Sequence, residues 1–179
     1  MSAITEGDRL PDDWWDAPLP PGVEIGARTW FYSSFAFLHC HSRRPVPLRV
    51  GEACSINVAT QFALGPLGEV DVGDHTTLNG SLIAVNGRLE IGASGMIGYD
   101  TVIADDLFWR PLAPGDDPPP PGPETVIGEN TWINPRARLR AGITVGDDAV
   151  IGTKAVVLED VPAGAIVVGA PGRVVGWVR

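Results

Sequence analysis

The sequence predicts an all-β solenoid of about six stacked coils, each with three short, flat sides. Three observations support this fold class. Large apolar residues recur every six positions, a glycine follows the first apolar residue of every coil, and 22 Gly and 17 Pro among 179 residues favour turns over long helices. A six-residue period fits neither the 3.6-residue period of an α-helix nor a long strand with alternating apolar residues.

The start of each coil is marked by an apolar residue and a following glycine, at Ile25-Gly26, Val50-Gly51, Val72-Gly73, Ile91-Gly92, Ile127-Gly128 and Val145-Gly146. The six-residue spacing is clearest at Ile127, Ile133, Leu139, Val145, Ile151 and Val157. We expect the inward positions of the earlier coils at Ile25, Phe31, Phe37, Val50, Ile56, Phe62, Val72, Leu78, Ala84, Ile91, Ile97 and Ile103. Ala84 is the one small residue among these eighteen.

Two corners of each coil carry turn residues, and the third does not. Gly follows the first apolar position, and Asn or Gly follows the second in five coils, at Asn57, Asn79, Gly98, Asn134 and Gly152. Because Gly and Asn tolerate positive φ, these corners are predicted to be tight turns. Every insertion falls after the third position, in residues 38–49, 63–71, 85–90 and 104–126. Loops stacked along one edge are where a solenoid usually carries its function.

The predicted organisation is an N-terminal arm of residues 1–22, a solenoid domain of residues 23–176 with the protruding loop 104–126, and a tail of residues 177–179. The arm matches no coil and contains Trp14 and Trp15. Paired tryptophans are rarely left exposed, so we expect the arm to cover the open first coil or to pack on a neighbour.

Composition narrows the function classes. A net charge of −9 gives no reason to expect nucleic acid or an anionic membrane as a partner. We find neither a long apolar segment nor an N-terminal leader, so a cytoplasmic protein is expected. Cys40 and Cys54 make neither a disulfide framework nor a zinc quartet.

The stretch from Ile127-Gly-Glu-Asn-Thr-Trp-Ile-Asn-Pro through Val145-Gly-Asp-Asp-Ala-Val-Ile-Gly to Val168-Gly-Ala-Pro-Gly-Arg resembles the hexapeptide-repeat acyltransferases. The resemblance implies a left-handed parallel β-helix, a homotrimer with ligand sites between subunits, and acetyl-CoA or another acyl-CoA as donor to a small-molecule substrate. It also implies cofactor contacts at Trp132, Asn134, Gly152, Thr153, Lys154 and Arg173. Glu159 stands where the family commonly has a lysine. Arg136, Arg138 and Arg140 alternate on one coil, and they form either a phosphate-binding ladder or salt bridges to neighbouring coils.

The family's catalytic histidine lies near the start of the long loop, but residues 104–126 contain no histidine. Asp105 or Asp106 could serve as a carboxylate base if burial raised its pKa. Arg110 could bind an anion or stabilise an oxyanion, and Trp109 could form a stacking wall beside a planar ligand. For each of these residues, a purely structural or surface role is the competing interpretation.

The remaining candidates for the base are His39 and His41, which flank Cys40 in the first insertion and could act on a neighbouring subunit. No metal is expected. The zinc carbonic anhydrases of this fold take two ligands from a closely spaced histidine pair on a later coil, and this sequence lacks such a pair.

The leading hypothesis is therefore an acyltransferase acting on a hydroxyl or an amine of a small metabolite. The first alternative is an enzyme of the same fold that catalyses a cyclisation, isomerisation or hydrolysis. A non-catalytic structural or regulatory trimer is the second.

Overall fold

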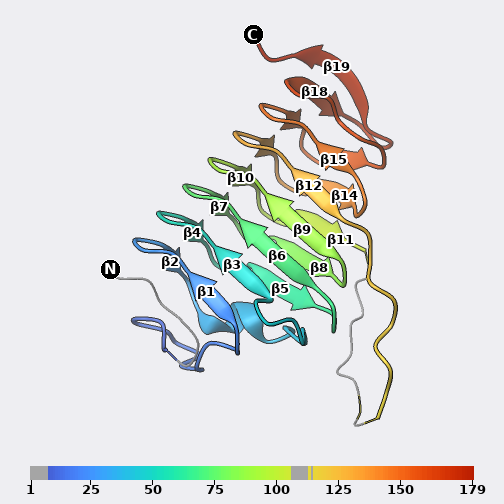
Figure 1. Ribbon diagram of the computed structural model, residues 1–179. Coiled ribbons are helices and arrows are strands. Elements are labelled where there is room, and N and C mark those ends of the chain that lie inside the picture. Colours follow the sequence, from blue (N-terminus) through green and yellow to red (C-terminus); the bar gives the residue numbers. More distant parts are fainter. Residues whose placement is uncertain (1–7, 106–112, 114) are drawn as a thin grey trace.

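The computed structural model describes residues 8–105, 113 and 115–179. The chain winds into a left-handed parallel β-helix whose three sides are three sheets, so the predicted fold class is confirmed. Figure 1 shows the coils stacked from the N-terminal to the C-terminal end, with the insertion after β11 leaving one edge of the prism.

Each sheet takes one strand from each coil. Sheet A contains β1 (Val23–Ile25), β3 (Leu48–Val50), β6 (Glu69–Val72), β9 (Arg88–Ile91), β12 (Thr125–Ile127) and β15 (Thr144–Val145). Sheet B contains β2 (Trp30–Phe31), β4 (Ser55–Ile56), β7 (Thr77–Leu78), β10 (Met96–Ile97), β13 (Trp132–Ile133), β16 (Val150–Ile151), β18 (Ala165–Val168) and β19 (Arg173–Trp177). Sheet C contains β5 (Gln61–Leu64), β8 (Leu82–Val85), β11 (Val102–Ala104), β14 (Arg138–Arg140) and β17 (Val156–Val157). In the first coil the 3₁₀ helix η1 (Ser34–Phe37) takes the place of a sheet C strand and contacts β5.

We name the three junctions by the sheets that they join. The AB corner and the BC corner are tight turns, and the CA edge carries the insertions. The described parts of all four insertions leave the prism at the CA edge, as the sequence predicts. The coils are numbered one to six from β1 to β17.

Side chains at the repeated positions fill a narrow interior. The large apolar residues form columns through the three sheets, and all of those with less than 2% exposure belong to one cluster. The smaller residues expected beside them are buried as well, at Thr29, Cys54, Thr60, Thr76, Thr101, Thr131, Ala137, Ala149 and Ala155. Several of the threonine hydroxyls donate to a carbonyl oxygen of the next coil, for example Thr76 Oγ1 to Gly92 O at 2.9 Å.

One inward position differs from the prediction. In coil three the residue aligned with Phe62 and Ile103 is Ile83, not Ala84. The BC corner of this coil is one residue shorter than its neighbours, because Gly80 makes the turn with φ +50. The expectation of Ala84 at this position was therefore wrong by one residue. With Ile83 in its place, the column of inward residues in sheet C contains large side chains throughout.

The corner glycines were expected to adopt positive φ, and the structure gives them a different role. The positive φ lies three residues after the apolar position, at residues such as His75 (φ 60) and Asn130 (φ 53). The glycine directly after the apolar residue has no positive φ and is required by space instead. A Cβ at Gly92 would lie 2.6 Å from the backbone nitrogen of Glu129 in the next coil.

The N-terminal arm covers the first coil, as predicted, but not through its tryptophans. Leu10 and Leu19 join the apolar core, at 5% and 3% exposure. Trp14 and Trp15 remain 59% and 45% exposed and contact the ring of Phe35. At the other end, β19 runs antiparallel to β18 and reaches Trp177.

We predict that Gly92→Ala lowers the free energy of unfolding by about 2 kcal/mol, because the added methyl group meets the rigid backbone of the next coil. Gly95→Ala is the matched control in the same coil, since its nearest contact would be 3.5 Å away. Urea denaturation should leave this control within about 0.5 kcal/mol of the parent protein. Equal destabilisation by both substitutions would contradict the spacing argument.

Candidate functional site

Three charged side chains stack along the BC corner of the last coils. Asp100, Arg136 and Lys154 occupy the same turn position in coils four, five and six, each with a positive φ. Their backbones are joined between coils, since Arg136 N donates to Tyr99 O at 2.7 Å and Lys154 N to Pro135 O at 3.1 Å. The fold therefore aligns these side chains along one ridge.

Arg136 and Arg138 are partly held by their neighbours. Arg136 Nε lies 3.4 Å from Asp100 Oδ2, and both side chains are more than 60% exposed, so this ion pair is weak. Arg138 Nη1 donates to Asp100 O at 2.5 Å. Arg140 makes no ion pair with any residue that the structure describes. One of the three arginines thus makes the expected salt bridge, while all three remain exposed to solvent.

A groove runs from this ridge toward the N-terminal coils. Its volume is about 380 Å³, and it is lined by Ala59, Gln61, Gly80, Leu82, Asp100, Thr101, Val102, Arg136 and Arg138. The charged side chains lie at the coil-four and coil-five end, and the lining from coils two and three is uncharged. We call this the BC groove.

The six residues expected to contact the cofactor fall in three places. Asn134, Gly152, Thr153 and Lys154 lie at the BC corner of coils five and six, where Asn134 Nδ2 donates to Ile151 O at 2.9 Å. Trp132 lies on the outer face of sheet B and is 52% exposed. Arg173 begins β19 and lines a separate hollow with Glu159 and Asp160. The structure brings four of the six together with Arg136 and Arg138.

Asp105 lies at the CA edge directly after β11. Its carboxylate accepts hydrogen bonds from the backbone N–H of Asn86, at 2.8 Å, and of Gly87, at 3.0 Å. The Asn86 side chain in turn bonds Leu67 N and Pro120 O. This network joins three stacked loops, so the visible role of Asp105 is to anchor the start of the long loop. The other expected residues of this loop, Asp106, Trp109 and Arg110, lie outside the described residues.

His39 and His41 lie further along the same edge, after η1. Their ring centroids are 6.4 Å apart, and His41 N donates to Leu64 O at 2.8 Å. Burial, and secondarily the charge of His39, lower the pKa of His41. Burial also raises the pKa of the Cys40 thiol between them. The structure therefore favours a neutral imidazole and a neutral thiol at this place.

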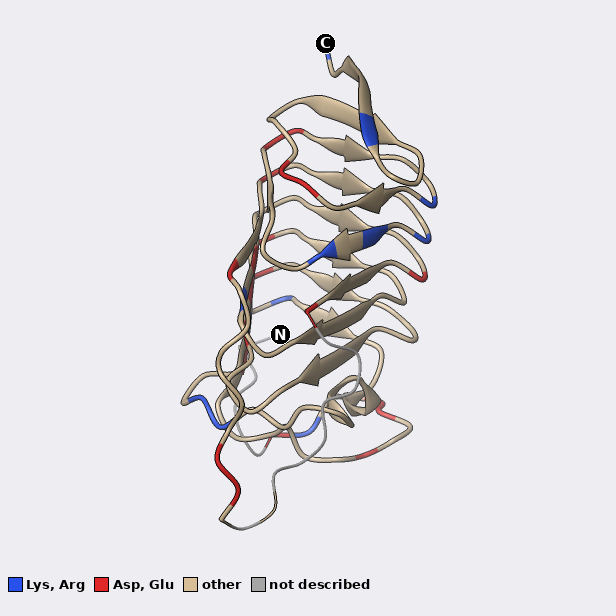
Figure 2. Ribbon diagram, turned by 90° about the vertical axis from the view of Figure 1, so that its right-hand side faces the viewer, with Lys and Arg blue, Asp and Glu red and all other residues tan. Residues whose placement is uncertain are grey.

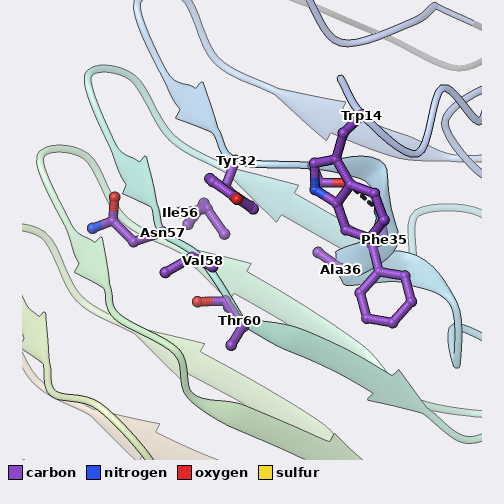
Figure 3. Close-up of a pocket in the computed structure, with 10 residues that line it drawn as sticks. Trp14, Tyr32, Phe35, Ala36, Ile56, Asn57, Val58 and Thr60 are labelled. Carbon is purple, nitrogen blue, oxygen red and sulfur yellow. Dashed lines mark hydrogen bonds between the residues drawn. The ribbon is translucent and has the colours of Figure 1, made fainter. Parts of the chain in front are cut away.

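A pocket that we did not predict from the sequence lies at the BC corner of coils one and two. Trp14, from the arm, faces Tyr32, Ile56 and Val58 across it (Figure 3). The other lining residues are Ser33, Phe35, Ala36, Asn57, Ala59 and Thr60, and the volume is about 200 Å³. We call it the arm pocket. Its only sequence signal is the Trp14-Trp15 pair, because the pairing of the arm with coil two is not local.

The charges of the prism are unevenly placed (Figure 2). The outer face of sheet A carries an ion-pair ladder in which Arg49 bridges Glu24 and Asp71, and Arg88 bridges Glu69 and Asp71. Residues that point outward at aligned positions of sheets B and C are mostly uncharged, among them Trp30, Met96 and Trp132 on sheet B and Leu82, Val102 and Val156 on sheet C. Sheet A is thus the side best suited to water.

Comparison with known proteins shows which families this chain is similar to. The family described as bacterial transferase hexapeptide (six repeats) matches residues 124–159, which include the ridge at Arg136 and Lys154. Over 55 residues the chain is 51% identical to a chloramphenicol acetyltransferase of Agrobacterium fabrum, covering 31% of this chain and 26% of that protein. Residues 124–159 of the chain thus carry repeats like those of the bacterial hexapeptide transferases, and part of the chain is similar to a known acetyltransferase.

Two further comparisons cover more of the chain. A serine acetyltransferase of Mycobacterium tuberculosis is 31% identical over 127 residues, or 71% of this chain and 42% of that protein. The crystal structure of a galactoside acetyltransferase in complex with coenzyme A shares the fold, with a TM-score of 0.54 and 18% identity over 88% of this chain and 66% of that one. The match with each of these two curated relatives spans less than half of the relative's length.

The described residues were also searched for membrane-spanning helices and for metal sites. Among the residues that the structure describes, we find no helix long and apolar enough to cross a membrane. The same residues contain no group of three or more His, Cys, Asp or Glu side chains placed to hold a metal ion.

We predict that Asp105→Ala lowers the free energy of unfolding by about 2 kcal/mol, because it leaves the N–H groups of Asn86 and Gly87 without their acceptor. Asp105→Asn keeps one acceptor oxygen and should cost less than half as much in the same urea titration. An alanine variant as stable as the parent would rule out the anchoring role.

We also predict that the imidazole of His41 titrates below its ordinary value of 6.5, as measured by NMR of the ring protons. Because the fold favours the neutral ring, this group's contribution to stability is complete above the unfolded pKa of about 6.5 and is lost as the pH falls from there through the lowered pKa of the folded state. His39→Gln should raise the midpoint of His41 part of the way, since burial is the larger cause. A His41 midpoint at or above 6.5 would contradict the burial that the structure gives this ring.

Proposed function

We propose that this protein transfers an acyl group from an acyl-CoA thioester to a hydroxyl or amine of a small molecule. Its relatives are acetyltransferases, and one neighbour of the same fold is a complex with coenzyme A. The observation that carries the proposal is the pair of Arg136 and Arg138 beside Asp100 at one end of the BC groove, with Lys154 one coil further along the same corner.

The ridge suits the phosphates of coenzyme A. The donor carries a pyrophosphate and a 3′-phosphate, which need cationic partners, and a long uncharged pantetheine arm. In a protein of net charge −9, two cations at the corner of adjacent coils, Arg136 and Lys154, and Arg138 at the start of β14 form a local site for such a group. The side chains of Asn134 and Thr153 lie beside the ridge and supply polar contacts.

The transfer step needs a base near the thioester. The acceptor O–H or N–H attacks the carbonyl carbon, the new C–O or C–N bond forms, and the C–S bond breaks. The proton leaves the acceptor through the base, and coenzyme A departs as the thiol. We propose His41, kept neutral by burial and by His39, as the base, while Asp105 orders the loop beside it.

His41 and the BC groove lie on opposite sides of sheet C in one chain. Sheet C strands contain two to four residues, so the two junctions are separated by as much as about 13 Å. We therefore propose a homotrimer in which the CA edge of one subunit meets the BC groove of the next. The outer faces of sheets B and C, uncharged apart from residues such as Arg138 and Arg140, are the surfaces available for that contact. We place the enzyme in the cytoplasm, where acyl-CoA donors are made.

The test is calorimetric titration with coenzyme A, with Arg136→Ala and Lys154→Ala as the variants. We expect each substitution to weaken binding about fivefold to tenfold, and more at low salt, because each removes a phosphate partner.

Arg28→Ala is the matched control, since Arg28 has the same exposed corner conformation but lies at the AB corner of coil one, paired with Glu52. Its affinity for coenzyme A should equal that of the parent protein. Failure of the parent protein to bind coenzyme A at millimolar concentration would overturn the proposed function.

A further inference from the structure

We propose that the arm pocket holds the acyl group of the donor, so that the preferred donor carries an apolar acyl group of about six or seven carbons rather than acetyl. This inference rests on the proposed use of an acyl-CoA. It adds the class of acyl group and assigns a role to the N-terminal arm.

The arm pocket and the BC groove adjoin at one shared lining residue. Ala59, at the BC corner of coil two, lines both of them. The groove is lined by Arg136 in coil five, by Asp100 and Gly80 in the coils before it, and by Ala59 in coil two. On the other side of Ala59, the pocket is lined by Tyr32 and Trp14. A linear ligand whose phosphates lie at the ridge therefore points into the pocket with its far end.

The length of the donor matches this path. Three coils separate Arg136 from Ala59, a distance of about 14 Å at the roughly 4.8 Å spacing of neighbouring strands. The pantetheine arm has about twelve chain bonds between pyrophosphate and sulfur. At about 1.2 Å per bond, the advance of an extended chain, it also spans about 14 Å. The thioester thus reaches Ala59, and whatever is attached to its carbonyl enters the arm pocket.

The pocket has the size and chemistry of an apolar acyl site. Its volume of about 200 Å³ exceeds the ~150 Å³ of a cavity that holds a benzene ring. An acetyl group would leave most of this space unfilled. Trp14, Phe35 and Val58 contribute apolar surface, and the Asn57 side chain at the rim donates to Asn79 Oδ1 at 2.6 Å. Charged side chains are missing from the described lining, which disfavours a sugar phosphate or an acidic acyl group.

Trp14 is held in place before any ligand binds. Its ring lies 5.5 Å from Phe35, measured between centroids. The arm around it is tied to η1, because Ser34 N donates to Asp13 Oδ2 at 3.0 Å and Ala17 N to Ser34 Oγ at 3.2 Å. A wall that is already ordered loses little conformational entropy when an acyl group packs against it.

The test compares the affinities of coenzyme A, acetyl-CoA, hexanoyl-CoA and benzoyl-CoA by calorimetry on the full chain. Each methylene buried from water strengthens binding about fourfold, so four more methylenes in a partly open pocket should give at least about a tenfold preference for hexanoyl-CoA over acetyl-CoA. Benzoyl-CoA should show a preference of similar size.

Trp14→Ala should reduce the preference to within about twofold and leave the affinity for coenzyme A unchanged. Trp15→Ala is the matched control, because Trp15 contacts the same Phe35 ring but does not line the pocket. Val58→Thr, which replaces a methyl group by a hydroxyl at a 42% exposed position, is a second variant that should weaken the preference without risk to the fold.

The outcomes separate the two proposals. Tight binding of coenzyme A with equal affinity for all acyl donors overturns the acyl pocket alone. A preference that survives both Trp14→Ala and Val58→Thr places the acyl group elsewhere and also overturns it. Absence of binding for coenzyme A and all its thioesters overturns the proposed function and the acyl pocket together.

Discussion

The fold depends on the close stacking of one coil on the next. Each sheet strand is bonded to strands roughly 4.8 Å above and below, and at the AB corner this spacing leaves no room for a Cβ. At Gly26, Gly73, Gly92 and Gly146, such an atom would lie within 2.5–2.6 Å of the adjacent coil. Stacking at this distance also fixes where surface side chains lie, because a side chain at a given position in one coil lies directly beside its equivalent in the next. Side chains of equivalent positions therefore form columns along the prism.

The repeat was readable from the sequence because it is local and its demands are simple. The period of six, the corner glycines and the single insertion edge all follow from one coil's geometry. Two details needed the structure. Ile83 replaces Ala84 in the core because Gly80 shortens one corner, and a spacing count cannot detect a missing residue inside a turn. The positive φ lies at residues such as His75 and Lys154, which sequence preferences for glycine do not reveal.

The site was less predictable than the fold. The structure places Asn134, Gly152, Thr153 and Lys154 at one corner, and the cofactor contacts that the resemblance implies for them stay a prediction. Arg173 belongs to the final antiparallel strand and lines a different hollow, because the repeat has ended there. The arm pocket was missed since it joins Trp14 to Val58 across more than forty residues without any repeat to relate them.

The charged side chains of sheet A and those of the BC corner have different surroundings in the prism. Sheet A holds its acidic residues in exposed ion pairs with Arg49 and Arg88, which keep this side compatible with water but add little stability. Among the described residues, Asp100 is the one carboxylate that forms an ion pair with Arg136. The candidate base and the donor groove then lie on the two junctions that flank sheet C, and the short strands between them cannot bend to bring them together. A single coil geometry thus provides a rigid groove and a rigid edge, and the proposed active site takes its edge from another copy of the chain.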